Sequence, residues 1–264
     1  MTPNLSEALV ILVLFYAVTG IDAATFFTHD GGATSVTIGD DISERVTLSP
    51  AITIKGTQFT EIFISENGMV TTEDGFYGGL SFPYAKPWIA PFGADIIPAG
   101  GTMEYQQFTS TDTAQMEYAT QLVNEVYKDA AFTAVNALVV TWTDVKIDSG
   151  SKANTFQLAL VSDASRLYAI FLYDKLEFLP EKIGASAGDD ATFYTVCYSD
   201  KQSHLQFLDR MSNSQCGTGG ILVFQLDGST WNGAEYVCSH VYTPACRNRP
   251  GPPEANYDVR CPTA

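Results

Sequence analysis

Short segments of alternating or continuous apolar residues dominate the chain after its first 25 residues. Residues 102–108 alternate, with Met103 and Tyr105 on one side, and a period of two predicts a β-strand. Ala137–Trp142 is instead an unbroken, Val-rich run, which is typical of a strand buried on both faces. The same reasoning predicts further strands at Phe156–Val161, Leu167–Tyr173, Phe193–Tyr198 and Ile221–Leu226.

Turn residues between these segments predict two hairpins. Glu66-Asn67-Gly68 separates Glu61–Ile64 from Met69–Thr72, and an Asn-Gly pair tolerates the positive backbone angles of a type I′ turn. Ser162-Asp-Ala-Ser165 separates Phe156–Val161 from Leu167–Tyr173 in the same way. We therefore expect antiparallel neighbours at both places.

One segment has helical periodicity. Apolar residues recur at spacings of three and four up to Lys128, and Asp112 stands where an N-cap residue is expected. The apolar positions are Met116, Ala119, Leu122, Val123, Val126 and Tyr127. The predicted fold class is therefore mainly β, an antiparallel sandwich or curled sheet with one covering α-helix, followed by a cysteine-bearing C-terminal tail.

The two ends of the chain differ from its middle. Ala8–Val18 is an apolar run followed by small residues, too short to cross a bilayer, and it predicts a secretory signal peptide over residues 1–23. No later run reaches spanning length, so we expect no membrane span in the mature chain. Residues 24–228 are expected to form the main domain. Residues 229–264, with three cysteines and Arg247-Asn-Arg-Pro-Gly-Pro-Pro253, form a tail or a truncated small module.

All five cysteines lie in the last 68 residues of the chain. Cys197 and Cys216 flank a polar loop and are the best candidates for a disulfide in an oxidising compartment. Cys238, Cys246 and Cys261 then leave one cysteine that stays free or pairs with a second chain, which predicts a disulfide-linked homodimer as one outcome. The chain has no Cys-x-x-Cys pair and only three His, which argues against zinc.

The charge balance excludes one class of partner. The chain has 30 acidic and 14 basic residues, a net charge of −16. Such a surface repels phosphates, so we expect no nucleic-acid binding.

Three phrases follow one another in a fixed order. They are Phe59-Thr-Glu-Ile-Phe-Ile-Ser-Glu-Asn-Gly-Met69, Ile89-Ala-Pro-Phe-Gly-Ala-Asp95, and Val139-Val-Thr-Trp-Thr-Asp-Val145 followed by Asn154-Thr-Phe-Gln157. This ordered set resembles the nidogen-like extracellular domain (NIDO) family of nidogens, tectorins and transmembrane mucins. The resemblance covers roughly Phe26 to Asp227. It departs from the family at Gly93, where an aromatic is frequent, and at Ile96 and Ile97, where acidic residues are frequent.

The resemblance implies a secreted protein of the extracellular matrix. It implies cell–matrix adhesion through contacts with matrix or cell-surface proteins, without catalysis and without a cofactor. Relatives usually carry further modules, so the chain is either a minimal secreted form or a fragment of a larger protein.

A second class of function is a calcium- or glycan-binding module. Pro91 and Gly93 are expected to fix a turn that presents Asp95, either to nearby backbone amides or as a calcium ligand with Asp144 or Asp148. No ordered Asp-x-Asp-x-Asp loop supports calcium. The large rings of this region are expected to fill the core, with a ligand-stacking platform as the rival interpretation; they are Trp88, Phe92 and Trp142.

A third class is a secreted serine hydrolase. Gly184-Ala-Ser186-Ala-Gly188 matches the Gly-x-Ser-x-Gly nucleophile elbow, and Asp227 and His240 follow in hydrolase order. The residues before it make a poor strand and those after it a poor helix, which argues against an elbow. The resemblance to the NIDO family implies that these small residues form a loop. The sequence therefore favours a non-catalytic protein.

Overall fold

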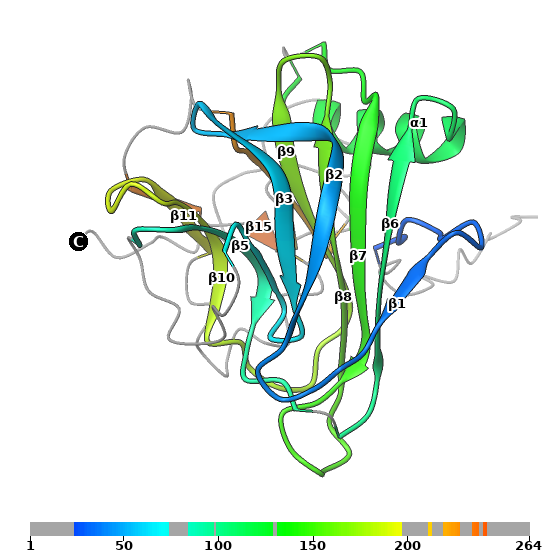
Figure 1. Cartoon of the computed structure of the whole chain (residues 1–264), viewed down its shortest axis with the longest axis vertical. Coiled ribbons are helices and arrows are strands. Elements are labelled where there is room, and N and C mark those ends of the chain that lie inside the picture. Colours follow the sequence, from blue (N-terminus) through cyan, green and yellow to red (C-terminus); the bar gives the residue numbers. More distant parts are fainter. Residues whose placement is uncertain are drawn as a thin grey trace, which may run out of the picture.

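A computed structural model describes residues 24–73, 84–97, 99–128, 131–196, 211–212, 219–227, 234–237 and 240–241. The predicted signal peptide, the five cysteines and most of the C-terminal tail lie outside these residues. Within them, strands pack in two layers and one helix lies beside the longer strands (Figure 1). The predicted fold class is confirmed for this part of the chain.

The strands form two sheets, both mainly antiparallel. Strands that are consecutive in the sequence but belong to different sheets mark the places where the chain crosses from one layer to the other. Sheet A has the order β1-β6-β7-β8-β9-β13-β12-β15 and sheet B the order β14-β11-β10-β5-β4-β3-β2. In sheet A the strands are β1 (Thr34–Val36), β6 (Thr102–Thr109), β7 (Asn136–Val145), β8 (Asn154–Ser162), β9 (Leu167–Lys175), β12 (Met211–Ser212), β13 (Ile221–Gln225) and β15 (His240–Val241). In sheet B they are β2 (Ser43–Ile54), β3 (Thr57–Ser65), β4 (Met69–Thr71), β5 (Pro87–Gly93), β10 (Lys182–Ala187), β11 (Phe193–Val196) and β14 (Ala234–Val237).

The central strands of sheet A are buried on both faces. Side chains alternate across a strand, so Val140 and Leu158 point into the core between the sheets, while Val139 and Ala159 point to the other side. That second face is covered by α1 (Thr113–Val126). Burial on both sides explains why these strands read as continuous apolar runs in the sequence.

The helix α1 covers sheet A much as its periodicity predicts. Met116, Ala119, Leu122 and Val123 are buried against the outer face of the sheet. Asp112 occupies the N-cap position, but its carboxylate does not cap the helix. It accepts a hydrogen bond from the backbone N–H of Thr109 at 2.7 Å, so it closes the turn before the helix. Among the described residues, no helix has both the length and the apolarity needed to cross a membrane.

Both predicted hairpins are present, but the type of the first turn was predicted wrongly. β3 and β4 pair up to Ser65 and Met69, which leaves three residues in the loop rather than two. Only Gly68 has a positive φ there (72°), whereas a type I′ turn needs two such residues. The type I′ turn instead joins β2 to β3, where Lys55 and Gly56 have φ of 47° and 82°.

The β3–β4 turn is buried and holds the two sheets together at one end. The indole N–H of Trp142, in sheet A, donates to the carbonyl of Ser65 at 3.1 Å. The side-chain oxygen of Asn67 accepts from the N–H of Ile96 at 2.7 Å, and its carbonyl accepts from the N–H of Ala94 at 3.1 Å. This turn therefore accepts hydrogen bonds from the backbone N–H groups of the segment that follows β5. These bonds fix the place where the chain crosses from one sheet to the other.

A buried carboxyl group lies in the same turn. Glu66 has no exposed surface, and its Oε1 accepts from the backbone N–H of Ile42 at 2.9 Å. Burial, with a smaller contribution from the nearby charge of Asp41, raises the pKa of Glu66 to about 7. The backbone hydrogen bond from Ile42 acts in the opposite direction but does not cancel the effect of burial.

Two polar side chains of the third phrase also have structural roles. Gln157 is buried and pairs with Phe27 through its amide, accepting from the backbone N–H at 2.8 Å and donating to the carbonyl at 3.1 Å. Asn154 is fully buried and accepts from the N–H groups of Glu177 and Phe178. Each side chain therefore satisfies the backbone of a segment that has no strand partner of its own at that point.

Two segments that were expected to turn are strands. Pro91 and Gly93 belong to β5, and Gly184 and Ser186 belong to β10, which pairs with β5 in antiparallel register. Both segments are rich in Gly, Pro and Ala, which are weak strand formers. Burial and pairing inside sheet B therefore override local propensity here.

The buried turn predicts a large effect of Gly68→Ala on stability. A Cβ at residue 68 would lie 2.0 Å from the carbonyl oxygen of Phe92, and the backbone has positive φ. We expect the free energy of unfolding to fall by about 3 kcal/mol or more, measured by urea denaturation. Gly56→Ala is the matched control, because it has φ of 82° and nothing within 4 Å of its Cβ, and about 1 kcal/mol is expected. Equal losses in the two variants would contradict the close approach of Gly68 to Phe92.

Because the pKa of Glu66 is raised, we expect the free energy of unfolding to depend on pH. Its folded pKa, about 7, is above the ordinary value of 4.5, so the folded state holds the proton more tightly. The stability that this proton contributes is fully present below pH 4.5 and is lost as the pH rises through about 7. Glu66→Gln keeps a neutral group at every pH, so its stability relative to the parent should increase between pH 5 and pH 8. One pKa unit corresponds to about 1.4 kcal/mol, so we expect a gain on the order of 3 kcal/mol in denaturant unfolding. A difference that does not change with pH would refute the assignment.

Candidate binding site

The calcium candidate Asp95 lies just after β5 and is exposed. A bridge between Ile97 and Lys146 brings its segment beside the end of β7. Asp148 accepts from the N–H of Gly150 at 2.7 Å, and Asp144 forms an ion pair with Lys175 at 3.6 Å. In the described part of the chain, no three His, Cys, Asp or Glu side chains are placed to hold a metal ion. Calcium binding through Asp95 stays a prediction.

Ser186 does not lie on a nucleophile elbow, and its two candidate partners lie in or next to strands of the other sheet. Ser186 is inside β10, has no exposed surface, and donates its hydroxyl to the carbonyl of Tyr84 at 3.1 Å. Asp227 follows β13, and His240 belongs to β15; both of those strands are in sheet A, whereas β10 is in sheet B. An elbow serine needs an exposed, strained turn between a strand and a helix, and β10 gives Ser186 neither.

The disulfide candidates lie outside the described residues, so their pairing stays a prediction. They are Cys197, Cys216, Cys238, Cys246 and Cys261.

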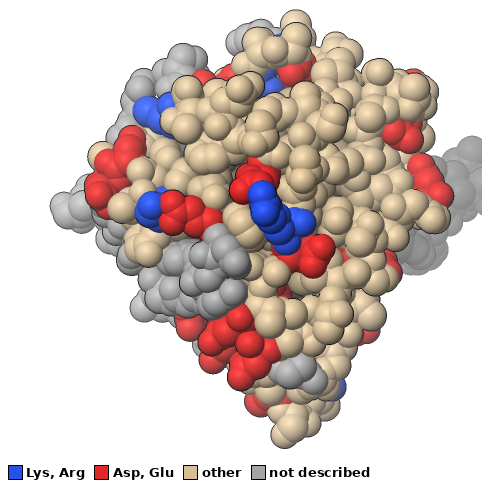
Figure 2. All heavy atoms as spheres, in the orientation of Figure 1, with Lys and Arg blue, Asp and Glu red and all other residues tan. Residues whose placement is uncertain are grey.

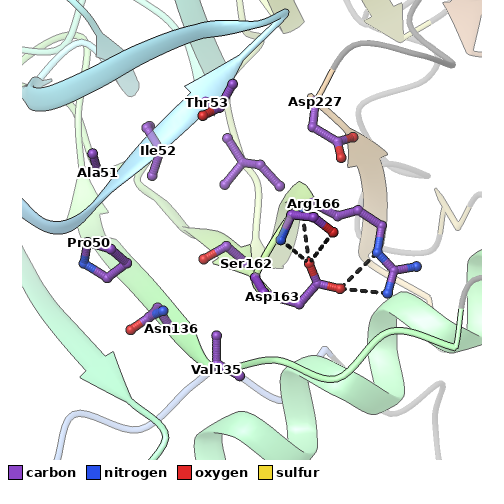
Figure 3. Close-up of a pocket in the computed structure, with 13 residues that line it drawn as sticks. Pro50, Ala51, Ile52, Thr53, Val135, Asn136, Ser162, Asp163, Arg166 and Asp227 are labelled. Atoms are coloured by element: carbon purple, nitrogen blue, oxygen red, sulfur yellow. Dashed lines mark hydrogen bonds and ion pairs between the residues drawn. The ribbon is translucent and has the colours of Figure 1, made fainter.

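A cavity of about 230 Å³ opens where β2 passes over the β8–β9 turn (Figure 3). One wall is residues 50–53 of β2, and the other is residues 162–167 with Val135 and Asn136. Asp227, just beyond β13, lies beside Arg166 on this second wall, because the preceding N–H of Leu226 donates to the carbonyl of Leu167 at 2.8 Å (Figure 3). The two sheets thus contribute one wall each.

The β8–β9 turn is a tightly bonded unit. Asp163 accepts hydrogen bonds from the N–H groups of Ser165 (2.8 Å) and Arg166 (2.7 Å), and from the Arg166 guanidinium at 2.6 Å. Partial burial opposes the charged form of Asp163, but these hydrogen bonds outweigh it and lower its pKa. The same hydrogen bond raises the pKa of Arg166. The pair is therefore ionised and mutually neutralised at physiological pH.

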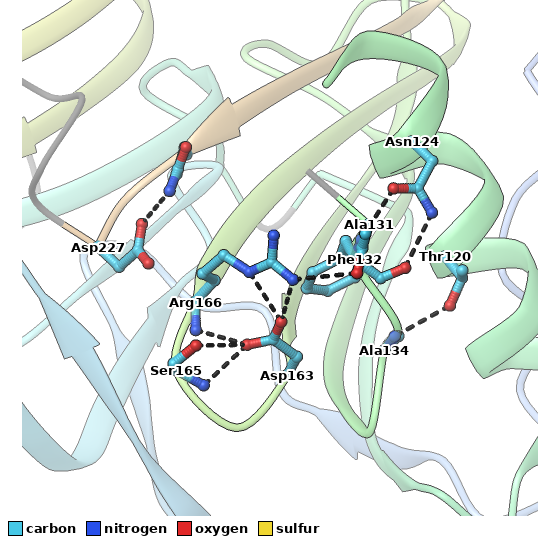
Figure 4. Close-up of polar contacts among 10 residues, drawn as sticks. Thr120, Asn124, Ala131, Phe132, Ala134, Asp163, Ser165, Arg166 and Asp227 are labelled. Carbon is cyan, nitrogen blue, oxygen red and sulfur yellow. Dashed lines mark hydrogen bonds and ion pairs between the residues drawn. The ribbon is translucent and has the colours of Figure 1, made fainter. Parts of the chain in front are cut away.

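The helix holds the neighbouring wall of the cavity in place (Figure 4). Asn124 of α1 donates to the carbonyl of Phe132 at 2.9 Å and accepts from its N–H at 3.0 Å. Thr120 accepts from the N–H of Ala134 at 2.9 Å. The guanidinium of Arg166 lies 5.5 Å from the centre of the Phe132 ring, a cation–π arrangement. Helix, loop and turn are thus connected by contacts with defined geometry.

Asp227 differs from Asp163 in its partner. Its carboxylate accepts from the side-chain amide of Gln225 at 2.6 Å, a neutral donor. Burial is the main cause of a raised pKa, and the charge of Asp163 adds to it, while Arg166 acts weakly in the opposite direction. Among the described residues, the cavity is therefore lined by one neutralised ion pair and by one partly desolvated carboxylate that forms no ion pair.

Sequence reasoning considered Asp227 only as a hydrolase residue and did not find this cavity. Its turn, Ser162–Ser165, was predicted, and the Asp-x-Ser-Arg pattern within it is a signal for a side chain that bonds its own turn. The other wall depends on β2, which the apolar pattern did not predict as a strand. The site therefore required the tertiary structure.

The described surface is polar, and several of its ion pairs are exposed. Arg45 of β2 pairs with Glu61 of β3, and Lys86, just before β5, pairs with Glu73, just after β4, at 2.5 Å. Figure 2 shows one face of the molecule, on which Lys and Arg are few and acidic groups are spread over several places. Among the described residues, Ile147 is the large apolar side chain that is exposed (38%). No extended apolar docking face is therefore present on this part of the chain.

Comparison with known proteins identifies the family. The chain is 28% identical over 221 residues to mouse nidogen-2, which covers 71% of this chain and 16% of that protein. It is 28% identical over 227 residues to mouse nidogen-1, covering 71% of this chain and 17% of that protein. Human alpha-tectorin is 29% identical over 164 residues, which is 59% of this chain and 7% of that protein. No solved structure matches significantly.

The match therefore spans less than a fifth of the length of these relatives. The family model for the nidogen-like domain matches residues 60–228, which includes the β3–β4 turn, the cavity turn and Asp227. With more than half of the chain matched, this protein belongs to the nidogen-like domain (NIDO) family.

Proposed function

We propose that this chain is a secreted module of the extracellular matrix that associates with matrix or cell-surface proteins through protein–protein contacts. The observation that carries the proposal is the family match over residues 60–228. The nidogens and tectorins that share this domain are extracellular-matrix proteins. Adhesion is the finer step, and it is inferred from this kinship.

The described surface supports polar recognition. A net charge of −16 and the scarcity of exposed large apolar side chains favour partners that contribute basic or hydrogen-bonding groups. Exposed ion pairs such as Arg45–Glu61 contribute little to folding, about 0–1 kcal/mol, so such groups can exchange partners at low cost.

A non-catalytic role is consistent with the geometry of the hydroxyl that the sequence singled out. The Ser186 hydroxyl donates to a backbone carbonyl inside the sheet, which places it where no substrate carbonyl can approach.

One test of the proposed function concerns matrix association. The chain, expressed with its own leader and recovered from the medium, should bind at least one of immobilised laminin, collagen or cell-surface proteoglycan. Because the chain is acidic, this binding should weaken as salt rises from 50 to 500 mM, measured by biolayer interferometry. A heat-unfolded sample is the control. No binding to any of the three by folded protein would overturn the proposed function.

Another test concerns Ser186. A fluorophosphonate probe should leave the folded protein unlabelled, because the probe needs an exposed, activated serine hydroxyl. Ser186→Ala should behave identically in gel fluorescence and in mass spectrometry of the peptide that contains residue 186. Labelling of Ser186 in folded protein, abolished in Ser186→Ala, would establish the hydrolase interpretation instead.

A further inference from the structure

The cavity between β2 and the β8–β9 turn is large enough for a side chain and part of a backbone. Its volume of about 230 Å³ compares with roughly 30 Å³ for one water in the liquid. The walls are mixed: Ile52 and Leu167 are apolar, whereas Thr53, Asn136 and Ser162 carry polar side chains. Such a site can take an amphipathic group, with an apolar stem and a polar end.

One wall is the edge of a sheet. β2 is the last strand of sheet B among the described strands, and it turns into β3 through the type I′ turn at Lys55–Gly56. In such a hairpin the two residues that flank the turn, here Ile54 and Thr57, form both N–H···O=C hydrogen bonds with each other. Bonded and non-bonded pairs alternate along antiparallel strands, so the N–H and C=O of Thr53 point away from β3. They point to the side on which a further strand would be added.

The length of this edge is limited at both ends. The N–H of Lys55 donates to the carbonyl of Leu226 at 3.0 Å, which joins β2 to the chain beyond β13. Pro50 has no N–H to offer a neighbour. Residues 51–53 remain between them, so a partner strand would pair over about three residues, roughly 10 Å.

The charges select the partner. Arg166 and Asp163 neutralise each other, whereas the carboxylate of Asp227 is bonded to the neutral amide of Gln225. A cation beside Asp227 would relieve the unfavourable burial of that carboxylate, whereas an anion would add repulsion.

We propose that this cavity takes a lysine or arginine side chain from an extended segment of a partner protein. The backbone of the segment pairs with β2 at Thr53, and its cation contacts Asp227. Addition of a strand to an exposed sheet edge gives affinity through the main chain, and a side-chain pocket gives specificity. The inference rests on the proposed function, because it identifies a contact site for a partner protein.

The experiment uses three synthetic peptides with the full-length secreted chain. The peptide acetyl-Thr-Val-Thr-Lys-Thr-Val-Thr-amide is compared with versions that carry norleucine or glutamate at the centre. Fluorescence anisotropy or NMR titration should show the lysine peptide binding about tenfold or more tightly than the other two, the effect expected of one charged contact. Equal affinity of the three peptides would overturn the proposal.

Two variants localise the contact. Asp227→Asn keeps an acceptor for Gln225 but removes the charge, so it should bring the lysine peptide to the affinity of the norleucine peptide. Asp148→Asn is the matched control, because it removes the same charge from the exposed β7–β8 connection, and it should leave the affinity unchanged. An Asp227→Asn protein that is folded by circular dichroism and still prefers lysine would overturn the site.

Two further peptides test the strand pairing without altering the protein. The lysine peptide is N-methylated on either of its two alternating sets of amides, since only one set can face β2. One methylated peptide should lose binding and the other keep it; equal affinities would refute pairing with the edge. Matrix binding by the same protein is read separately. If the chain binds matrix proteins but shows no preference for the lysine peptide, this site is wrong and the proposed function stands. If the chain prefers the lysine peptide but binds no matrix protein, the site stands and the proposed function is wrong.

Discussion

The sandwich depends on one buried turn, Ser65 to Gly68, that is shared by both layers. A hydrogen bond from Trp142 joins the turn to sheet A, and Asn67 supplies both acceptors for the chain that leaves β5. Gly68 is needed because the carbonyl of Phe92 occupies the place where a Cβ would be. A second link between layers, from the Tyr173 hydroxyl to the carbonyl of Pro91 at 2.8 Å, shows that β5 is the strand on which these contacts converge.

The sequence predicted the strands whose burial is simplest. β7, β8, β9 and β13 are apolar on both faces, so their composition alone indicates a buried strand. β2 was missed because it is an edge strand with a bulge between Thr47 and Ile52, where the alternation is interrupted. A turn was expected within β5 because Pro and Gly favour turns, and a loop was expected in place of β10 from the family resemblance. Pairing within sheet B makes both segments strands, although Pro, Gly and Ala are weak strand formers.

The functional residues were harder to predict because their roles also depend on contacts between segments that are far apart in the sequence. The phrases that resemble the family proved to hold structural polar groups: Asn67, Asn154 and Gln157 each satisfy buried backbone. A polar residue within such a phrase can therefore be needed for folding rather than for binding or catalysis. Asp227 was a hydrolase candidate only because it follows Ser186 in the chain order of a Ser-Asp-His triad, and the structure instead places it on a cavity wall.

The two ends of β3 have different physical properties. Its nine residues separate the buried turn at Ser65 from the type I′ hairpin at Lys55 by about 30 Å. At that distance two unit charges interact by only about 0.5 kcal/mol at an effective dielectric constant of about 20, so protonation of Glu66 can change the stability of the sandwich with little effect on the field at Asp227. One end holds the layers together, and the other leaves a sheet edge and a carboxylate beside a cavity. A module with this division can keep a fixed frame while its open end is used for a partner, because the contacts that define the fold are not those that a partner would have to replace.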